Sequence, residues 1–88
     1  MSIEQNAKIE MNRMKEIMEN LKINNKSKLS VHFFDFANNY LKDGIYFFNN
    51  KKFIEAFEAF VIAWAYIDAG LKLKFFKIPD KYKKYFTV

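Results

Sequence analysis

The sequence predicts an all-α fold: a three-helix up-down-up bundle followed by a short basic aromatic C-terminal tail. Along three long segments, apolar residues recur at alternating spacings of three and four, the period of one helix face. No segment shows the sustained apolar–polar alternation that indicates a strand. We therefore expect one domain over residues 1–88, with helices at about 3–23, 28–49 and 52–75 and a tail over 76–88.

The first helix, expected over residues 3–23, has a narrow apolar seam among mostly charged and amide residues. The spacing of the seam residues alternates between four and three: Ala7, Met11, Met14, Met18 and Leu21. Such a seam predicts that one face packs against the other helices. Three methionines make that face adaptable, because their side chains are unbranched and flexible.

The second helix, expected over residues 28–49, follows a polar break at 24–27, and either Ser27 or Ser30 can serve as its N-cap. It carries two apolar stripes. One is Val31, Phe34, Leu41, Ile45 and Phe48, and the other is Phe33, Phe36, Ala37, Tyr40 and Phe47. A face this wide predicts that the helix can contact two neighbouring elements.

The third helix, expected over residues 52–75, has the strongest pattern. A short polar turn at 49–52 makes it antiparallel to the second helix. Its large apolar residues are Phe53, Phe57, Phe60, Trp64, Ile67 and Leu71, beside a small-residue stripe of Ala56, Ala59, Ala63 and Gly70. Between residues 59 and 67 the helix is apolar on nearly all sides and must be covered all round. Pro79 ends it, and residues 79–82 can open a last short helical turn.

Composition excludes several classes of function. The chain has no cysteine, and therefore no thiol nucleophile, disulfide or cysteine-bound metal. A chain of 88 residues leaves little interior for a buried active site. Hydrophobic residues make up 51% of it and aromatic residues 19%, which is more apolar surface than one short bundle can bury. We therefore expect a non-enzymatic protein without cofactor or metal.

The sequence predicts a cytoplasmic protein that is not associated with a membrane. The N-terminal residues are acidic and polar, where a secretory signal needs a basic and then an apolar segment. The longest apolar run, residues 59–67, has nine residues and is bounded by Glu58 and Asp68. A membrane-spanning helix needs about 20 apolar residues.

The net charge of +5 lies entirely near the C-terminus, where residues 71–88 hold six lysines and one aspartate. Aromatic residues are interleaved with these lysines, as in surfaces that bind single-stranded nucleic acid. This candidate surface for a partner or a nucleic acid comprises Lys72, Lys74, Phe75, Phe76, Lys77, Lys81, Tyr82, Lys83, Lys84 and Tyr85. The alternative is that the aromatic rings fold back over the ends of the second and third helices while the lysines stay in water. Codon bias toward lysine is a further explanation of the charge.

His32 and Asp68 are a candidate structural polar pair. A hairpin centred near residue 50 pairs position i with about 100−i, which sets the only histidine opposite Asp68. Asp68 interrupts the apolar run, so a buried carboxylate there needs a partner: His32, a lysine, a tyrosine hydroxyl or a helix N-terminus. The other acidic residues are scattered, so we predict no catalytic, cofactor-binding or metal-binding residue.

Residues 40–73 resemble an archaeal family of small helical proteins known as domain of unknown function 357. The resemblance is carried by Tyr40, Asp43, Tyr46-Phe47, Ala56-Phe57-Glu58-Ala59, Ala63-Trp64-Ala65 and Asp68-Ala69-Gly70. This chain departs from the family pattern at Asn49-Asn50, where Gly-Asp is usual, and at Gly44, where alanine is usual. The resemblance implies a three-helix up-and-down bundle in an archaeon, and it implies no reaction and no functional residue.

A weaker likeness connects the hairpin to a single tetratricopeptide-type unit, through the spacing of Tyr40, Gly44, Phe47, Ala56, Phe60 and Ala63. The chain contains no second copy, and a stable array needs about three. The apolar third helix, the methionine seam of the first and the surplus of aromatic residues predict that one face pairs with another chain. The functional hypothesis is therefore a non-enzymatic helical protein-interaction module that self-associates as a homo-oligomer or binds a protein partner. The alternative is a nucleic-acid-associated protein that binds through the tail.

Overall fold

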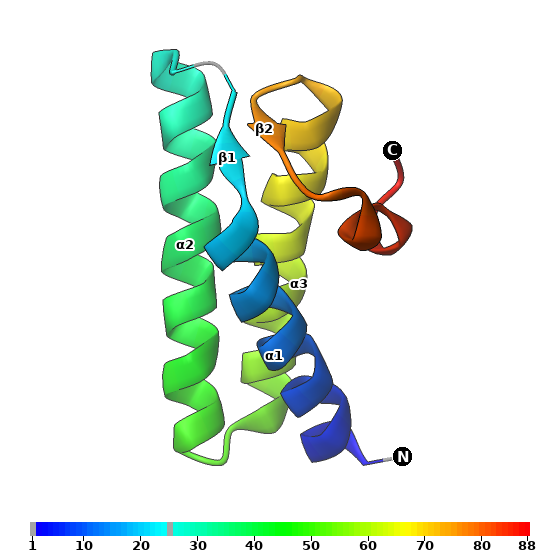
Figure 1. Cartoon of the computed structure of the whole chain (residues 1–88). Helices are drawn as coiled ribbons and strands as arrows, with labels where there is room; N and C mark the ends of the chain where they lie inside the picture. Colours follow the sequence, from blue (N-terminus) through cyan, green and yellow to red (C-terminus); the bar gives the residue numbers. More distant parts are fainter. Residues whose placement is uncertain (1, 25) are drawn as a thin grey trace.

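The computed structural model describes residues 2–24 and 26–88, and Asn25, in the predicted break, lies outside them. Its elements are α1 (Ile3–Asn20), β1 (Lys22–Ile23), α2 (Lys28–Asn49), α3 (Phe53–Lys72), β2 (Phe76–Lys77) and a 3-10 helix, η1 (Asp80–Tyr85). Figure 1 shows α1 and α3 running in one direction and α2 in the other. The predicted up-down-up three-helix bundle with a short C-terminal tail is confirmed.

Local hydrogen bonds explain where the helices begin. The Ser2 hydroxyl accepts from the Gln5 N–H at 3.2 Å while the Gln5 side chain accepts from the Ser2 N–H at 3.1 Å, so α1 starts with a capping box. Of the two predicted N-caps, Ser27 is the one that caps α2, because its hydroxyl accepts from the Ser30 N–H at 3.1 Å.

Two predicted helix ends are corrected, at 23 and at 75. The first helix ends at Asn20, because Lys22 and Ile23 instead pair antiparallel with Lys77 and Phe76 in a two-residue sheet. This short pairing has no alternation pattern by which the sequence could reveal it.

The third helix ends at Lys72 because the backbone turns into the left-handed region at Lys74, where φ is 61°. The Phe75 N–H then donates to the Gly70 carbonyl at 2.8 Å, and the Lys74 N–H donates to the Leu71 carbonyl at 3.1 Å. These two bonds form a Schellman motif at the C-terminus of α3, and the motif directs residues 75–77 back toward β1.

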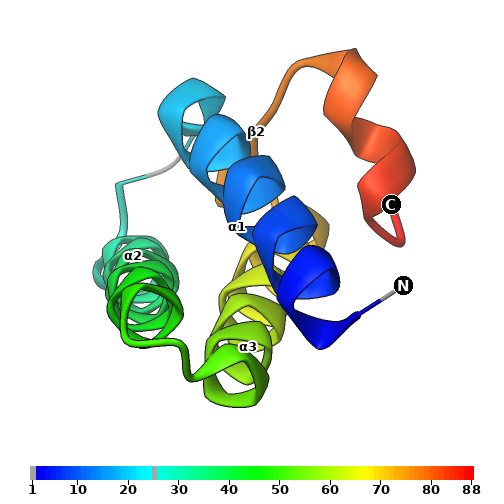
Figure 2. The ribbon, with the colours of Figure 1, turned by 90° about the horizontal axis from the view of Figure 1, so that it is seen from below.

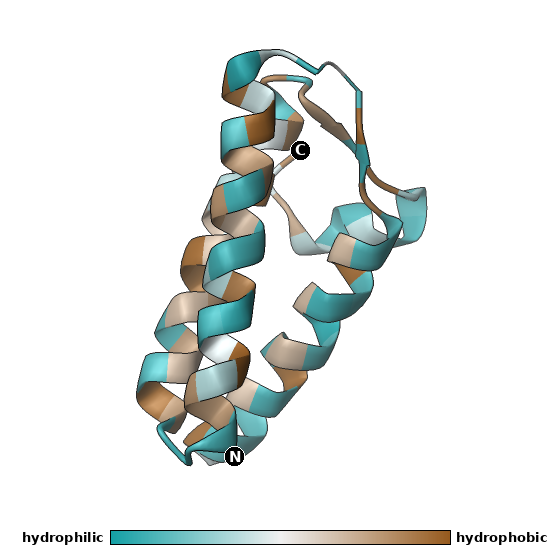
Figure 3. Ribbon diagram, turned by 90° about the vertical axis from the view of Figure 1, so that its left-hand side faces the viewer, coloured by the Kyte–Doolittle hydropathy of each residue, from teal (hydrophilic) through white to brown (hydrophobic). Residues whose placement is uncertain are grey.

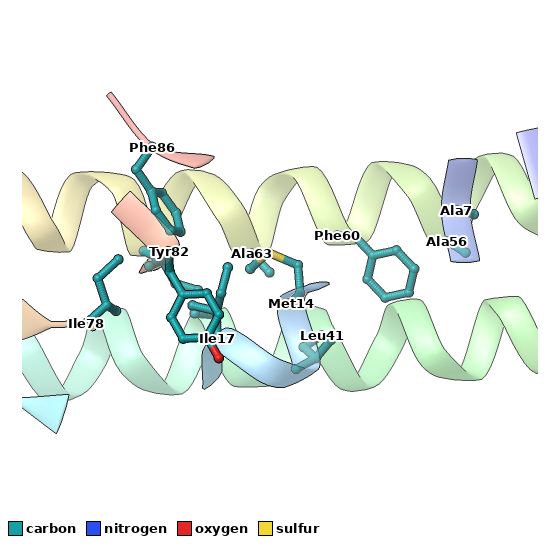
Figure 4. Close-up of a cluster of buried hydrophobic side chains, with 12 residues drawn as sticks. Ala7, Met14, Ile17, Leu41, Ala56, Phe60, Ala63, Ile78, Tyr82 and Phe86 are labelled. Carbon is teal, nitrogen blue, oxygen red and sulfur yellow. The ribbon is translucent and has the colours of Figure 1, made fainter. Parts of the chain in front are cut away.

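The core lies where α1 crosses one side of the α2–α3 hairpin (Figures 2 and 4). Phe60 is fully buried between α2 and α3. Gly44 permits this packing, because a Cβ at that position would overlap the Phe60 ring. The core residues come from the three long helices and the C-terminal tail: Ala7, Met14, Ile17, Ala37, Leu41, Ala56, Phe60, Ala63, Ile67, Ile78, Tyr82 and Phe86. In the described part of the chain, no helix is both long and apolar enough to cross a membrane.

Candidate functional site

The α2–α3 hairpin has one side that α1 does not cover. In Figure 2, α1 and the C-terminal tail both lie on the same side of the hairpin, and the described chain places no element on the other. The first stripe of α2 serves the covered side: Phe34 contacts Phe76 edge-on at 6.4 Å between ring centroids, and Leu41 is in the core. Ala37 of the second stripe is buried in the core, and the other members of that stripe line the uncovered side.

Aromatic rings gather on the uncovered side around Tyr66. The Tyr66 ring is stacked with Phe36 at 5.3 Å and with Tyr40 at 6.1 Å, and it meets the edge of Phe33 at 5.6 Å. Each of these four residues is half-buried within the chain. The rings therefore hold one another in fixed positions while part of each stays exposed.

A shallow groove of about 230 Å³ continues this surface toward the α2–α3 turn. Its lining residues are Tyr40, Asp43, Phe47, Glu55, Glu58, Ala59 and Ile62. The lining includes three carboxylates and no lysine, so this end of the surface is acidic. Even so, in residues 2–24 and 26–88 no three acidic or histidine side chains are placed to hold a metal ion.

The opposite end of the same surface is basic. Lys28, Leu29 and His32 line a second depression at the start of α2. The His32 ring packs edge-on against Phe36 at 4.3 Å, which joins this depression to the aromatic cluster. Leu29 is 53% exposed.

We call the whole surface the hairpin face. It comprises Lys28, Leu29, His32, Phe33, Phe36, Tyr40, Asp43, Phe47, Glu55, Glu58, Ala59, Ile62 and Tyr66. Figure 3 shows hydrophobic residues along the edge of the hairpin that lies away from α1. The sequence revealed the α2 half of this face as a second stripe, but not the α3 half, because α3 is apolar on nearly every side.

The predicted pair of His32 and Asp68 is corrected, because Asp68 is bound elsewhere. The hairpin does bring the two positions to the same level. However, Asp68 follows Tyr66 by two residues, about 200° around the helix, so its side chain points away from α2. The Thr87 N–H donates to Asp68 Oδ1 at 2.9 Å, and the Lys72 ammonium lies 3.5 Å from Oδ2.

Asp68 is 8% exposed, and its surroundings have two opposing effects on its pKa. Burial raises the pKa of the carboxyl group, but the hydrogen bonds from Thr87 and the charge of Lys72 outweigh it. The net pKa lies below the ordinary value. The expectation that this carboxylate needs a partner is confirmed for a lysine, while Thr87 is a partner that the sequence did not indicate.

Most aromatic residues of the predicted tail surface pack against the rest of the fold and are not available for stacking with a ligand. Phe76 and Tyr82 are buried, Phe75 packs edge-on against Phe33 at 5.4 Å, and Tyr85 is half-buried. The Tyr82 hydroxyl donates to Glu16 at 2.9 Å. Desolvation, together with this bond and the charge of Glu16, raises the pKa of Tyr82.

Phe75 and Phe76 pack on Phe33 and Phe34 at the start of α2, as the sequence-based alternative expected. That alternative is wrong for Tyr82, Tyr85 and Phe86, which pack on α1 and α3. The Trp64 indole N–H donates to the Tyr85 carbonyl at 2.8 Å, and the Trp64 ring stacks on Phe86 at 5.9 Å. The Arg13 guanidinium lies over the Tyr85 ring at 4.2 Å. The C-terminal tail therefore joins α1 to α3.

The lysines of the predicted surface remain exposed, as that alternative expected. Lys72 pairs with Asp68 and Lys83 with Asp80, while Lys81 and Lys84 lie over the rings of Tyr82 and Tyr85. Lys74, Lys77 and Lys83 also line a groove of about 240 Å³, together with apolar residues that include Leu71 and Ile78. Lys22 is the cross-strand partner of Lys77, so two like charges face each other beside this groove.

Comparisons with known proteins identify the family. The sequence pattern of the family described as "Protein of unknown function (DUF357)" matches residues 5–76. The crystal structure of protein AF1782 from Archaeoglobus fulgidus, assigned to the same family, superposes with a TM-score of 0.75. That match covers 88% of this chain and 93% of the other at 21% identity, which shows a common fold. No curated protein matches the chain. The chain belongs to the DUF357 family.

Proposed function

We propose that this DUF357 protein is a non-enzymatic interaction module that docks a protein partner on its hairpin face. The observation that carries the proposal is the half-buried aromatic cluster around Tyr66 on a side of the bundle that no described element covers. We further propose that the protein works in the cytoplasm of an archaeon.

The chemistry of the hairpin face suits a protein rather than a small molecule. Tyrosine and phenylalanine are enriched at the centres of protein interfaces, where a few aromatic residues supply most of the binding energy. A small-molecule site is more enclosed than the groove beside Tyr40, which is shallow and open to solvent. The aromatic middle of the hairpin face, between its acidic and basic ends, fits the apolar side of a helix.

The packing of the rings also favours binding. Because Tyr66 is stacked between Phe36 and Tyr40, its rotamer is fixed before a partner arrives. Fixing a side chain on binding costs about 0.5–1.5 kcal/mol when the free chain is mobile, and a pre-packed ring avoids much of this cost. The exposed edges of the rings are then available for contact.

A matched pair of substitutions tests this function. Ile62, in the groove, is 39% exposed, and Ile9, on α1, is 43% exposed, so Ile62→Lys and Ile9→Lys introduce the same charge at equal cost to the fold. We expect tagged wild-type chain and I9K to capture the same partner from extracts of the source cells, and I62K to lose it. Equal capture by all three proteins, with equal thermal stability, would contradict the proposal.

Lys22, Lys74 and Lys77 lie close together, and we call them the lysine cluster. This cluster supports a second candidate function, association with a polyanion such as nucleic acid. The specific observation is the facing pair of Lys22 and Lys77 next to Lys74. Like charges directly opposite on paired strands are destabilising, and a bound phosphate backbone would relieve that repulsion. With Tyr82 and Phe76 buried, such binding would use phosphate contacts and would not stack bases on these rings.

Fluorescence anisotropy with labelled single-stranded and duplex oligonucleotides tests this second function. We expect micromolar binding that weakens steeply with salt and falls at least several-fold in Lys22→Glu/Lys77→Glu. The control is Lys8→Glu/Lys15→Glu, which removes equal charge from exposed positions of α1. Equal loss in both double variants would show that net charge alone governs binding, and the lysine cluster would then not be a site.

A further inference from the structure

We propose that the partner of the hairpin face is a second copy of this chain, packed antiparallel across that face in a symmetric dimer. This inference rests on the proposed function, and it adds the identity and orientation of the partner. The acidic end of one copy would meet the basic end of the other. The charges, the position of the aromatic cluster and the size of the face each support this arrangement.

The charge of the hairpin face changes sign along its length. Asp43, Glu55 and Glu58 line the end near the α2–α3 turn, and Lys28 and His32 line the end at the start of α2. In a parallel pair the carboxylates of the two copies would face one another. In an antiparallel pair Lys28 of each copy comes to the carboxylates of the other, so electrostatics favour the antiparallel orientation.

The aromatic cluster lies where the symmetry axis of such a dimer would pass. An antiparallel pair with a two-fold axis perpendicular to the helices brings the middle of each face onto itself. The middle of this face holds Phe36, Tyr40 and Tyr66, between the acidic and the basic ends. Ring edges from the two copies can interleave there without placing a charge at the centre of the interface.

The size of the face sets the expected strength of the dimer. From Leu29 to Phe47 the face extends about 27 Å at ~1.5 Å per residue, and it is two helices wide, about 20 Å. A footprint of roughly 500–600 Å² on each copy falls at the low end of specific interfaces. We therefore expect a reversible dimer with a micromolar dissociation constant and little dimer at nanomolar concentration.

Sedimentation equilibrium of the full chain tests the dimer, and the two isoleucine variants test its location. We expect wild-type chain and I9K to dimerise with the same micromolar constant, and I62K to remain monomeric at 100 µM. A wild-type monomer at that concentration would overturn this inference. Capture of a different partner that I62K abolishes would still support the proposed function, so the two failures can be told apart.

Charge reversal tests the orientation. Lys28→Glu alone and Glu55→Lys alone each turn two attractive contacts into repulsive ones, and we expect each to weaken the dimer about ten-fold at low salt. The double variant Lys28→Glu/Glu55→Lys restores complementarity and should recover most of the loss. Lys8→Glu, on α1, is the control and should leave the constant unchanged.

If I62K and both single reversals leave the dissociation constant of the dimer unchanged, the interface lies elsewhere and the inference is overturned. Single reversals that weaken the dimer without recovery in the double variant would overturn the antiparallel orientation. Thermal unfolding of each variant, followed by circular dichroism, distinguishes these outcomes from loss of the fold.

Discussion

Asp68 on α3 and Thr87 near the end of the chain are joined by three hydrogen bonds. The Thr87 N–H and hydroxyl donate to Asp68 Oδ1 at 2.9 and 3.0 Å, and the hydroxyl also lies 2.8 Å from Oδ2. Because Asp68 is buried and charged, these donors compensate for the water that it loses. The pair fixes the C-terminal tail against α3, and four predictions follow from this contact and from local packing.

Replacing Thr87 by valine should destabilise the protein by about 1–2 kcal/mol, because the shape of the side chain is kept while a donor to a buried carboxylate is lost. Urea denaturation followed by circular dichroism measures the change. Thr87→Ser keeps the hydroxyl and should cost less than half as much. If the serine and valine variants lose the same stability, the hydroxyl does not hold the tail.

The docking of the tail should weaken in acid. Because the net pKa of Asp68 is below the ordinary aspartate value of 3.8, the folded state binds a proton less readily than the unfolded chain. Its contribution to stability is therefore complete above about pH 4 and is lost as the pH falls through the lower pKa of the folded state.

The single tryptophan reports this transition, because the Trp64 ring is stacked on Phe86 of the tail. We expect a change in Trp64 fluorescence below pH 4 that is absent in Asp68→Asn, in which position 68 cannot ionise. An identical acid transition in both proteins would assign it to other carboxylates.

Lys51→Gly should stabilise the protein by about 0.5–1 kcal/mol. Lys51 lies in the turn between α2 and α3 and has a φ of 60°, a left-handed conformation that is unfavourable for residues with a side chain and accessible to glycine. The greater freedom of glycine in the unfolded state offsets part of the gain. Thermal unfolding measures the difference. Lys52→Gly is the control, because Lys52 has a φ of −94° and should gain nothing.

Gly44→Ala should destabilise the protein by about 1–2 kcal/mol. Alanine improves helix propensity by about 1 kcal/mol, but its Cβ would overlap the fully buried ring of Phe60. The free-energy cost of overpacking the core therefore exceeds the gain in helix propensity. Phe60→Leu costs stability in the wild-type background, and we expect it to cost less in G44A, because leucine makes room for the new methyl group. Denaturation of both pairs gives this coupling, and additive effects would contradict the proposed contact.

The sequence predicted the helices well because their apolar periodicity is long and repeated, as in the pattern from Phe53 to Leu71. It predicted the second stripe of α2 for the same reason, and with it half of the hairpin face. It missed the contribution of Tyr66, because periodicity within α3 cannot tell which of several apolar sides faces a neighbour.

The sequence was least informative where single contacts decide the structure. A two-residue strand at Lys22–Ile23 has too few residues for a pattern, and its pairing with Phe76–Lys77 depends on how the chain leaves α3. Asp68 illustrates the same limit. The need for a partner followed from its residue type, but the identity of Thr87 followed only from the path of the tail.

The bond between Tyr82 and Glu16 joins residues 66 positions apart. Small helical proteins fold fast when most of their contacts are local, and their rates fall as the mean sequence separation of contacts rises. The α2–α3 hairpin is local and can form early, whereas docking of α1 and the tail requires two distant parts of the chain to meet. This protein should therefore fold more slowly than helical bundles of equal length whose ends are free.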